Sequence, residues 1–276
     1  MQIRYLEMEG AGNRILVVDE RHRRRPPPDA DTIRRLGDPA TGPGFDQLMW
    51  VGPARSIAAV ASYRVFNRDG GEVEQCGNGV RCVARMLADA GDAPAGFLLE
   101  SPAGPVAARL AGGGQVAVDM GRPEFRPEHI PFIVDREANV YELDVNGELI
   151  EIGAVSLGNP HCVVALADTA GAAPARLGPL IERHPRFPKR TNVGFMATYS
   201  RDRIGLRVHE RGVGETLACG TGACAAVVVG RRRGDLDGDV RVDLPGGQLV
   251  VSWPREEDSV WLTGDAEMIS EGTIDL

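Results

Sequence analysis

An internal repeat is the feature of this sequence that most restricts its fold. The stretch RVFNRDGGEVEQCGNGVRCVARML at residues 64–87 aligns without a gap on RVHERGVGETLACGTGACAAVVVG at residues 207–230, and both contain Cys-Gly-x-Gly, at Cys76 and Cys219. The offset is 219 minus 76, or 143 residues, about half of the 276-residue chain. A repeat of this length predicts two copies of one unit about a pseudo-twofold axis, each presenting one cysteine to a shared cleft.

Both cysteines stand where a polar, glycine-rich turn leads into a helix. The apolar run 223–229 after Cys219 is suited to a buried helix, and a matching helix is expected from about residue 78 to residue 90. The first turn of a helix has unpaired N–H groups and the positive end of the helix dipole. We therefore expect the thiols to lose their protons readily, which favours chemistry over packing.

Composition favours a cytoplasmic protein with free thiols. A hydrophobic content of 43% is enough for two domains of about 140 residues. The net charge of -8 argues against nucleic acid or an anionic membrane as a partner. The first residues lack the apolar core of a signal peptide, and no run approaches the ~20 apolar residues of a membrane span. Without a secretory signal, the 5 cysteines predict free thiols rather than disulfides.

The boundary between the two units is expected near residue 119, where the proline-rich segment 121–132 resembles a linker. We predict an N-terminal αβ domain, residues 1–119, that carries Cys76, and a C-terminal αβ domain, residues 120–264, that carries Cys219. The tail 265–276 is expected to return to the first domain. Asn146-Gly147 predicts a β-hairpin in the second domain.

Local patterns predict mostly short strands with few helices. The elements expected in the first unit are strands at 2–9 and 14–20, a short capped helix at 31–36 that starts at Asp31, and a covered strand at 57–67. The Arg/Pro run at 21–28 is expected to be a charged surface loop, with anion binding as the alternative.

A pair of cysteines in a cytosolic protein has three common uses. Zinc sites need closer spacing than Cys76 to Cys82 or Cys219 to Cys224, so we expect no metal. A redox disulfide between Cys76 and Cys219 is a second possibility. The third is two-base proton transfer, in which a thiolate removes a proton from carbon and a thiol returns one to the opposite face. Cys82, Cys162 and Cys224 are expected to be buried and inert.

Proton transfer explains more of the sequence than the other two uses. Only Lys189 among 31 basic residues is a lysine, and it lies in a proline-flanked loop, so a Schiff base with pyridoxal phosphate is not expected and no cofactor is predicted. A carbanion beside a carboxylate then needs other stabilisation. The N–H groups around Gly77-Asn78 and Gly220-Thr221 can supply it by binding that carboxylate.

Several long motifs, in order, carry a family resemblance. They are MEGAGN, GFDQL, NRDGGEVEQCGNGVRC, SLGNPHCV, TNVGF and ERGVGETLACGTGAC. With them the chain resembles the pyridoxal-phosphate-independent diaminopimelate epimerases over nearly its whole length. The resemblance implies an α+β fold with two pseudo-symmetric domains, each a barrel-like sheet around a central helix. It also implies interconversion of LL- and meso-diaminopimelate, on the route to lysine and peptidoglycan, by a homodimer without a cofactor.

The same resemblance implies roles for individual residues. Cys76 and Cys219 would be the acid/base pair, and His161 and Glu210 would orient the reacting groups. The substrate-binding residues would be Asn13, Gln47, Asn67, Gly77, Asn78, Asn159, Asn192, Glu210, Arg211, Gly220 and Thr221. A glutamate for an ammonium and an arginine for a carboxylate suit the second amino-acid head of the substrate.

One departure and two alternatives remain. The first motif has Glu9 where the family usually has histidine, which could alter the charge of the cleft. A proline or hydroxyproline racemase of the same two-cysteine type is one alternative, although its substrates would leave Glu210 and Arg211 without a role. A protein that binds a small molecule or senses redox state without catalysis is the other.

Overall fold

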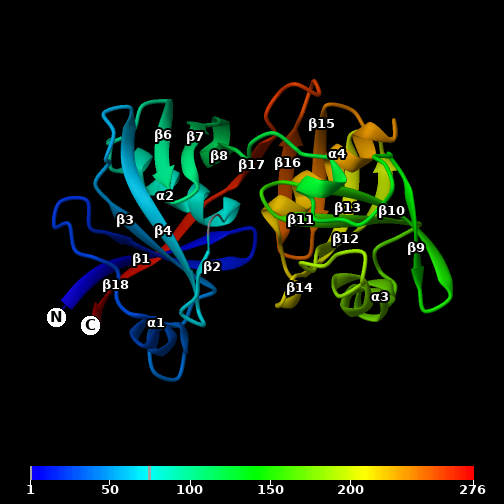
Figure 1. Ribbon diagram of the computed structural model, residues 1–276. Helices are drawn as coiled ribbons and strands as arrows, with labels where there is room; N and C mark the ends of the chain where they lie inside the picture. The colour runs from blue at the N-terminus through cyan, green and yellow to red at the C-terminus, as the bar shows by residue number, and fades with distance from the viewer. Residues whose placement is uncertain (1, 74–75) are drawn as a thin grey trace. The chain divides into compact units, whose positions relative to one another are not determined.

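The computed structural model describes residues 2–73 and 76–276, and the chain forms two compact units (Figure 1). The first unit comprises the residues up to 119 together with 263–276, and the second comprises residues 120–262. Within the described residues, no helix is both long and apolar enough to cross a membrane.

The first unit combines strands with two α-helices. Its elements are β1 (Gln2–Gly10), β2 (Asn13–Asp19), α1 (Ala30–Gly37), β3 (Gln47–Gly52), β4 (Ala59–Asn67), β5 (Glu72–Val73), α2 (Gly77–Asp89), β6 (Gly96–Ser101), β7 (Gly104–Leu110), the 3-10 turn η1 (Gly112–Gly114), β8 (Gln115–Asp119) and β18 (Glu267–Asp275). The strand β17 (Trp261–Asp265) runs across the boundary between the units.

The second unit repeats this order. Its elements are η2 (Pro127–His129), β9 (Tyr141–Val145), β10 (Glu148–Ser156), β11 (Pro160–Leu166), α3 (Ala173–Glu182), β12 (Asn192–Ser200), β13 (Arg203–Glu210), β14 (Gly214–Thr216), α4 (Gly220–Arg232), β15 (Asp239–Leu244) and β16 (Gly247–Ser252).

The strand pairings of the two units correspond one to one. In the first unit β2 runs parallel to β3, β3 is antiparallel to β4, and β4 pairs with β5 and runs parallel to β6. The second unit has the same pattern: β11 runs parallel to β12, β12 is antiparallel to β13, and β13 pairs with β14 and runs parallel to β15. The expected α+β class is confirmed, and the repeat seen around the cysteines extends to the topology.

The second helix of each unit is enclosed by strands. Helix α2 packs against β1, β2, β3, β7, β8 and β18, and α4 packs against β10, β11, β12, β13 and β16. Small side chains permit this enclosure, since a Cβ on Gly153 of β10 would lie 2.3 Å from Cγ1 of Val229 on α4. Both helices are therefore packed on several sides by strands of their own unit.

The other helix of each unit covers the outside of the sheet. Ile33 and Leu36 of α1 join an apolar cluster with Leu48 and Trp50 of β3. Leu177 and Ile181 of α3 join the equivalent cluster in the second unit. Each sheet is therefore packed on two sides, by a central helix and by an outer one.

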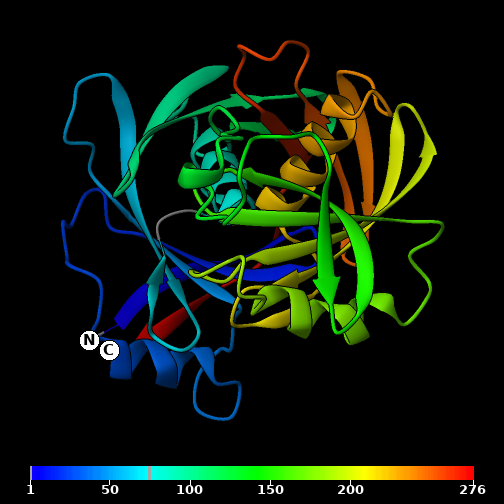
Figure 2. The ribbon, with the colours of Figure 1, turned by 45° about the vertical axis from the view of Figure 1, so that its right-hand side comes forward.

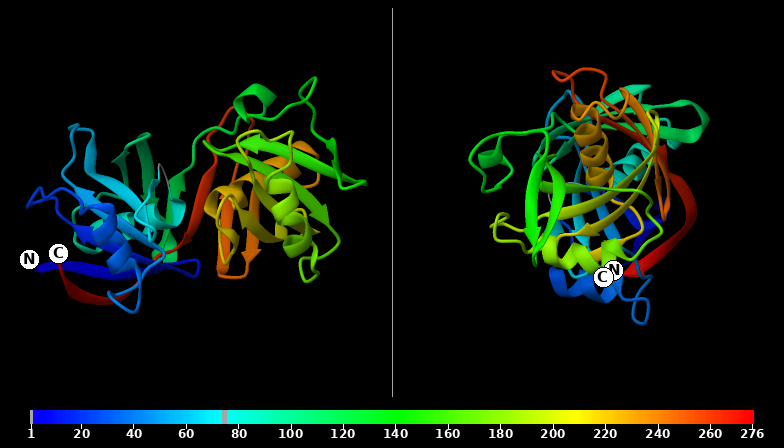
Figure 3. Two further views of the ribbon diagram at one scale, coloured as in Figure 1. Left: turned by 60° about the horizontal axis from the view of Figure 1, so that its bottom comes forward. Right: turned by 90° about the vertical axis from the view of Figure 1, so that its right-hand side faces the viewer.

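The last strand belongs to the first unit. Strand β18 pairs antiparallel with β1 over nearly its whole length, with Gln2 opposite Asp275. Figures 2 and 3 show the N and C labels next to each other, at the start of β1 and the end of β18. The first unit is thus made from two segments that are distant in sequence.

Two local expectations need correction. Helix α1 is capped by Asp29, whose carboxylate accepts from the N–H of Thr32, rather than by Asp31. The segment 121–132 is not a free linker, because Ile130 and Phe132 are buried in the core of the second unit. Its prolines shape a packed turn, whereas the Asn146-Gly147 hairpin is confirmed, with φ of 56° and 86°.

Candidate active site

Three strand ends bring the predicted residues of the second unit together. Strands β11 and β12 start side by side, with His161 opposite Asn192. Strand β13 ends beside the start of β12, since Val193 lies opposite His209 and Glu210 follows. Helix α4 then begins at Gly220, directly after Cys219. Sheet register therefore gathers residues that lie as much as 62 positions apart, as Asn159 and Thr221 do.

Cys219 occupies the N-cap of α4, with φ -129° and ψ 111°. Its thiol donates to Oε2 of Glu210 at 3.2 Å, and its sulfur lies 3.6 Å from Oγ1 of Thr221. Burial, and then the neighbouring Glu210 carboxylate, raise the pKa of Cys219 well above its usual value. The expectation that the helix terminus would favour a thiolate is wrong for Cys219, since desolvation and a like charge outweigh the dipole.

A chain of hydrogen bonds continues from Thr221 into the sheet. Nδ2 of Asn159 donates to Oγ1 of Thr221 at 3.4 Å, and Oδ1 of Asn159 lies 3.0 Å from Nε2 of His161. His161 is 1% exposed, and burial, with a smaller effect of the Arg211 charge, lowers its pKa to about 3. His161 is therefore a neutral imidazole that donates from Nε2 and fixes the Asn159 amide.

Asn192 and Arg211 are tied to backbone groups. Nδ2 of Asn192 donates to the carbonyl of Pro160 at 3.0 Å, and Oδ1 accepts from the N–H of Arg211 at 2.9 Å. The Arg211 guanidinium donates to the carbonyl of Lys189 at 3.2 Å and is otherwise exposed. Asn192 therefore sets the path of the turn from which the Arg211 side chain projects.

The first unit holds its cysteine in an equivalent frame with different side chains. Gln47 starts β3, directly opposite Asn67 at the end of β4, and donates to the Asn67 amide oxygen at 3.3 Å. The thiol of Cys76 donates to Oε1 of Gln47, and its sulfur accepts from the N–H of Gly79 at 3.3 Å, which caps α2. Asn67 takes the place that Glu210 has in the second unit, but the partner of the Cys76 thiol is the neutral amide of Gln47.

The remaining predicted residues of the first unit are at turns and at the helix start. Asn13 begins β2 after Ala11 and Gly12, which have φ of 53° and 80°. Gly77 and Asn78 form the first turn of α2 and are buried, as Gly220 is in α4. The N–H groups expected to bind a carboxylate thus lie beside both cysteines.

The two unusual features of the sequence lie on the surface of the first unit. Glu9 is exposed on β1, opposite Arg14 of β2 and Glu267 of β18. In the run 21–28, the Arg21 guanidinium bonds the carboxylates of Asp19 and Asp92 at 2.7 and 2.9 Å. The first arginine of that run is therefore occupied by ion pairs within its own unit.

Two residues near the site were missed by sequence reasoning. Thr216 of β14 donates its hydroxyl to Oε1 of Glu210 at 2.6 Å. Glu182, at the end of α3, is 3% exposed and accepts from the N–H of Gly212 at 2.9 Å, with Nε2 of His209 3.1 Å away. The only signal in the sequence was the position of Thr216 within the second copy of the repeat.

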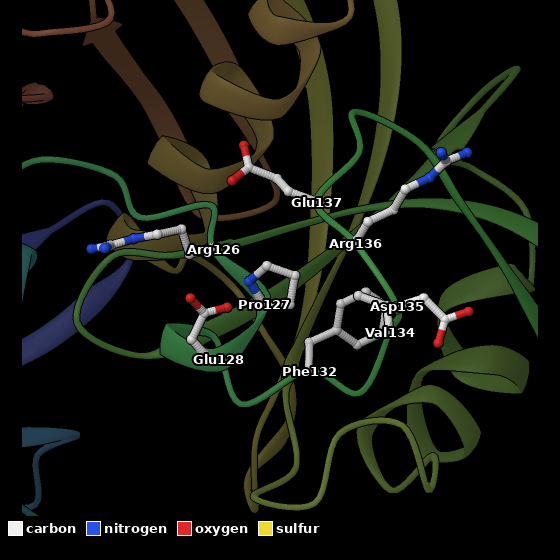
Figure 4. A pocket seen from close by; sticks show the side chains of 8 residues that line it. All are labelled: Arg126, Pro127, Glu128, Phe132, Val134, Asp135, Arg136 and Glu137. Carbon is white, nitrogen blue, oxygen red and sulfur yellow. The ribbon is translucent and has the colours of Figure 1, made fainter.

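A shallow pocket elsewhere in the second unit does not have the character of a catalytic site. It is lined by Arg126, Pro127, Glu128, Phe132, Val134, Asp135, Arg136 and Glu137. Figure 4 shows that the side chains of Arg126, Asp135 and Arg136 point in different directions. Charges that diverge in this way offer no common point to a ligand. Among residues 2–73 and 76–276, no group of three or more His, Cys, Asp or Glu is arranged to hold a metal ion.

Comparison with solved structures defines the class of fold. A probable proline racemase from Agrobacterium radiobacter superimposes with a TM-score of 0.70 at 18% identity, over 99% of this chain and 93% of that one. A hydroxyproline epimerase from Agrobacterium vitis gives a TM-score of 0.68 at 17% identity, over 99% and 92%. A Bacillus anthracis phenazine biosynthesis protein of the PhzF family gives 0.68 at 16%, over all of both chains. The fold is that of the racemases, epimerases and PhzF proteins.

Sequence comparison narrows this class to one family. The family model described as diaminopimelate epimerase matches residues 5–126 and 153–269. Proteins named diaminopimelate epimerase are 49% identical in Alkalilimnicola ehrlichii, over all of both chains, and 52% identical in Halorhodospira halophila, over 99% of this chain and 96% of the relative. The chain belongs to the diaminopimelate epimerase family.

Proposed function

We propose that this protein is an isomerase that converts LL-2,6-diaminopimelate to the meso form by two-base proton transfer between Cys76 and Cys219. One observation carries the proposal: in each unit a cysteine occupies the N-cap position of an enclosed helix, with its thiol bonded to a side chain at one of the converging strand ends. Family membership supports the substrate.

The proposed chemistry divides one inversion between two thiols. The thiolate of one cysteine takes the α-proton from carbon, and the thiol of the other delivers its own proton to the opposite face. The sulfur that began as a thiolate ends as a thiol, and the other ends as a thiolate, so charge and protons balance. Burial and Glu210 raise the pKa of Cys219, so we further propose that Cys219 begins as the acid and Cys76 as the base. The roles exchange for the reverse reaction.

The carbanion-like state needs a carboxylate sink, for which we propose the N–H groups at the starts of α2 and α4. Gly77 and Asn78 would supply this contact in the first unit, and Gly220 and Thr221 in the second. A helix N-terminus binds an anion through its unpaired donors and dipole. This arrangement of donors stabilises the developing charge without a bound cofactor.

The distal end of the substrate carries a second ammonium and carboxylate. We propose that Arg211, which projects from a turn anchored by Asn192, binds the distal carboxylate, and that Glu210, whose carboxylate contacts the Cys219 thiol, orients the reacting end. The amides of Asn13, Gln47, Asn67 and Asn159 would complete the contacts, with His161 fixing Asn159. By family resemblance we further propose that the protein is a cytoplasmic homodimer and that its two compact units are its two domains.

Deuterium uptake at the α-carbons of LL-diaminopimelate in heavy water tests the proposal. Wild-type protein is expected to produce deuterated meso product, and both Cys76→Ala and Cys219→Ala are expected to lose it. Cys162→Ala is the matched control, because it removes a buried thiol from the core of the second unit. No uptake by reduced wild-type protein would refute the function, and uptake with proline instead would favour the racemase alternative.

A further inference from the structure

The two oxygens of the Glu210 carboxylate accept hydrogen bonds from two different side chains, Thr216 and Cys219. The Thr216 hydroxyl donates to Oε1 at 2.6 Å, while the Cys219 thiol donates to Oε2 at 3.2 Å. We propose that Thr216 is a positioning residue. It holds the Glu210 carboxylate so that the second carboxylate oxygen accepts the hydrogen bond from the Cys219 thiol. The proposal rests on the proposed function, since it concerns a thiol placed in the reaction.

The backbone makes this contact specific. Thr216 of β14 lies opposite Val208 of β13, and Val208 comes two residues before Glu210 on the same strand. The hydroxyl and the carboxylate therefore belong to neighbouring strands. A carboxylate on a flexible side chain has several rotamers available. With one oxygen bonded to a neighbouring strand, the plane of the carboxylate is fixed and its second oxygen faces the sulfur.

The first unit provides an internal comparison. Val73 of β5 lies opposite Val65 of β4. This pair is equivalent to Thr216 and Val208, which lie opposite each other 143 residues later (216 minus 73). Valine therefore fits this place in the fold. The first unit has the neutral Asn67 where the second has Glu210. The hydroxyl is thus present in the unit that has a carboxylate to orient, and absent from the other.

Fixing the carboxylate has a consequence for the thiol. A carboxylate held against a thiol accepts a hydrogen bond from its S–H group and opposes a negative charge on the sulfur, and both effects keep the sulfur protonated. If the carboxylate could turn away, both effects would weaken and the thiolate would form more readily. Thr216 is therefore expected to maintain Cys219 as the thiol member of the pair.

Thr216→Val and Thr216→Ser test this directly. Valine matches threonine in shape and removes the hydroxyl, and serine restores it. We would label the folded protein with iodoacetamide at one neutral pH and stop the reaction at a series of times. The rate of alkylation of Cys219 is then measured by digestion and mass spectrometry of the peptides. Cys76 is a control in the same molecule, and the buried Cys162 reports unfolding.

Thr216→Val is expected to accelerate alkylation of Cys219 about twofold to tenfold, the range for the net contribution of one hydrogen bond. Cys76 should react at its original rate, Cys162 should stay unlabelled, and serine should restore the slow rate. In the epimerase assay, valine should lower kcat more than it changes KM. An unchanged or slower rate for Cys219 in the valine variant would overturn the proposal. Alkylation does not require turnover, so accelerated labelling of a protein without epimerase activity would refute the function and leave the positioning role intact.

Discussion

The buried carboxylate of Glu182 should determine the stability of the turn that carries Arg211. Glu182 ends α3, accepts from the N–H of Gly212 at 2.9 Å and from His209 across 3.1 Å, and lies 3.4 Å from the guanidinium of Arg190. Its own carbonyl accepts from the N–H of Thr191 at 3.1 Å. One residue thus holds the turn after β13 and the start of β12.

Replacing Glu182 by alanine removes the acceptor of the Gly212 N–H and the partner of the buried His209. Losing hydrogen bonds to a charged group costs about 1.5–3 kcal/mol. Hydrogen exchange of peptides covering β13 and β14 should therefore accelerate by about tenfold to a hundredfold, since about 1.4 kcal/mol corresponds to a factor of ten. Glu182→Gln keeps an acceptor for Gly212 and should lose only about 1 kcal/mol.

The stabilisation should also depend on pH. Burial acts to raise the pKa of Glu182, but hydrogen bonds from His209 and Gly212 outweigh it and hold the pKa below its usual range. A carboxyl with a lowered folded-state pKa stabilises the fold above its unfolded pKa of about 4.3, and this contribution is lost as the pH falls through the folded pKa. The hydrogen-exchange rates of the Glu182→Ala variant and of the wild type should therefore converge in strong acid. Equal exchange in the alanine and glutamine variants at neutral pH would refute the reasoning.

Three further predictions concern packing and charge. Gly153→Ala should destabilise the second unit by about 1–3 kcal/mol, because the new Cβ would overlap Val229, and thermal unfolding would measure it. Glu210→Gln removes the carboxylate charge beside Cys219, so the pKa of Cys219 should fall while kcat drops about a hundredfold; a pH series of alkylation and turnover would check both. Glu9→His should change the pH profile or KM of epimerisation, and identical values for both would show that the exposed Glu9 does not influence the reaction.

The repeat in the sequence was sufficient to predict a helix directly after each of the two cysteines, whereas the enclosure of these helices by strands was expected only from the family resemblance. Cys-Gly-x-Gly determines the helix starts locally, because a cap and a glycine turn depend on adjacent residues. The protonation of Cys219 could not be obtained in this way. It depends on burial and on Glu210, which only folding brings to the sulfur.

The packing of residues 121–132 and the role of Glu182 were unpredictable for a related reason. Prolines in the first suggested a linker, but Ile130 and Phe132 are covered by strands that come later in the chain. Glu182 looked like an ordinary last residue of a helix. Its partners lie 27 and 30 residues away, on a strand and a turn whose register was not evident from periodicity.

The position of β18 sets an order of completion during synthesis. Residues 120–262, which form the whole second unit, are synthesised before the strand that pairs with β1. Until then one edge of β1 has no pairing partner from its own sheet, because β2 occupies only the other edge. The first unit therefore keeps an open edge throughout the synthesis of the second, and this interval is when the first unit is most exposed to misassembly.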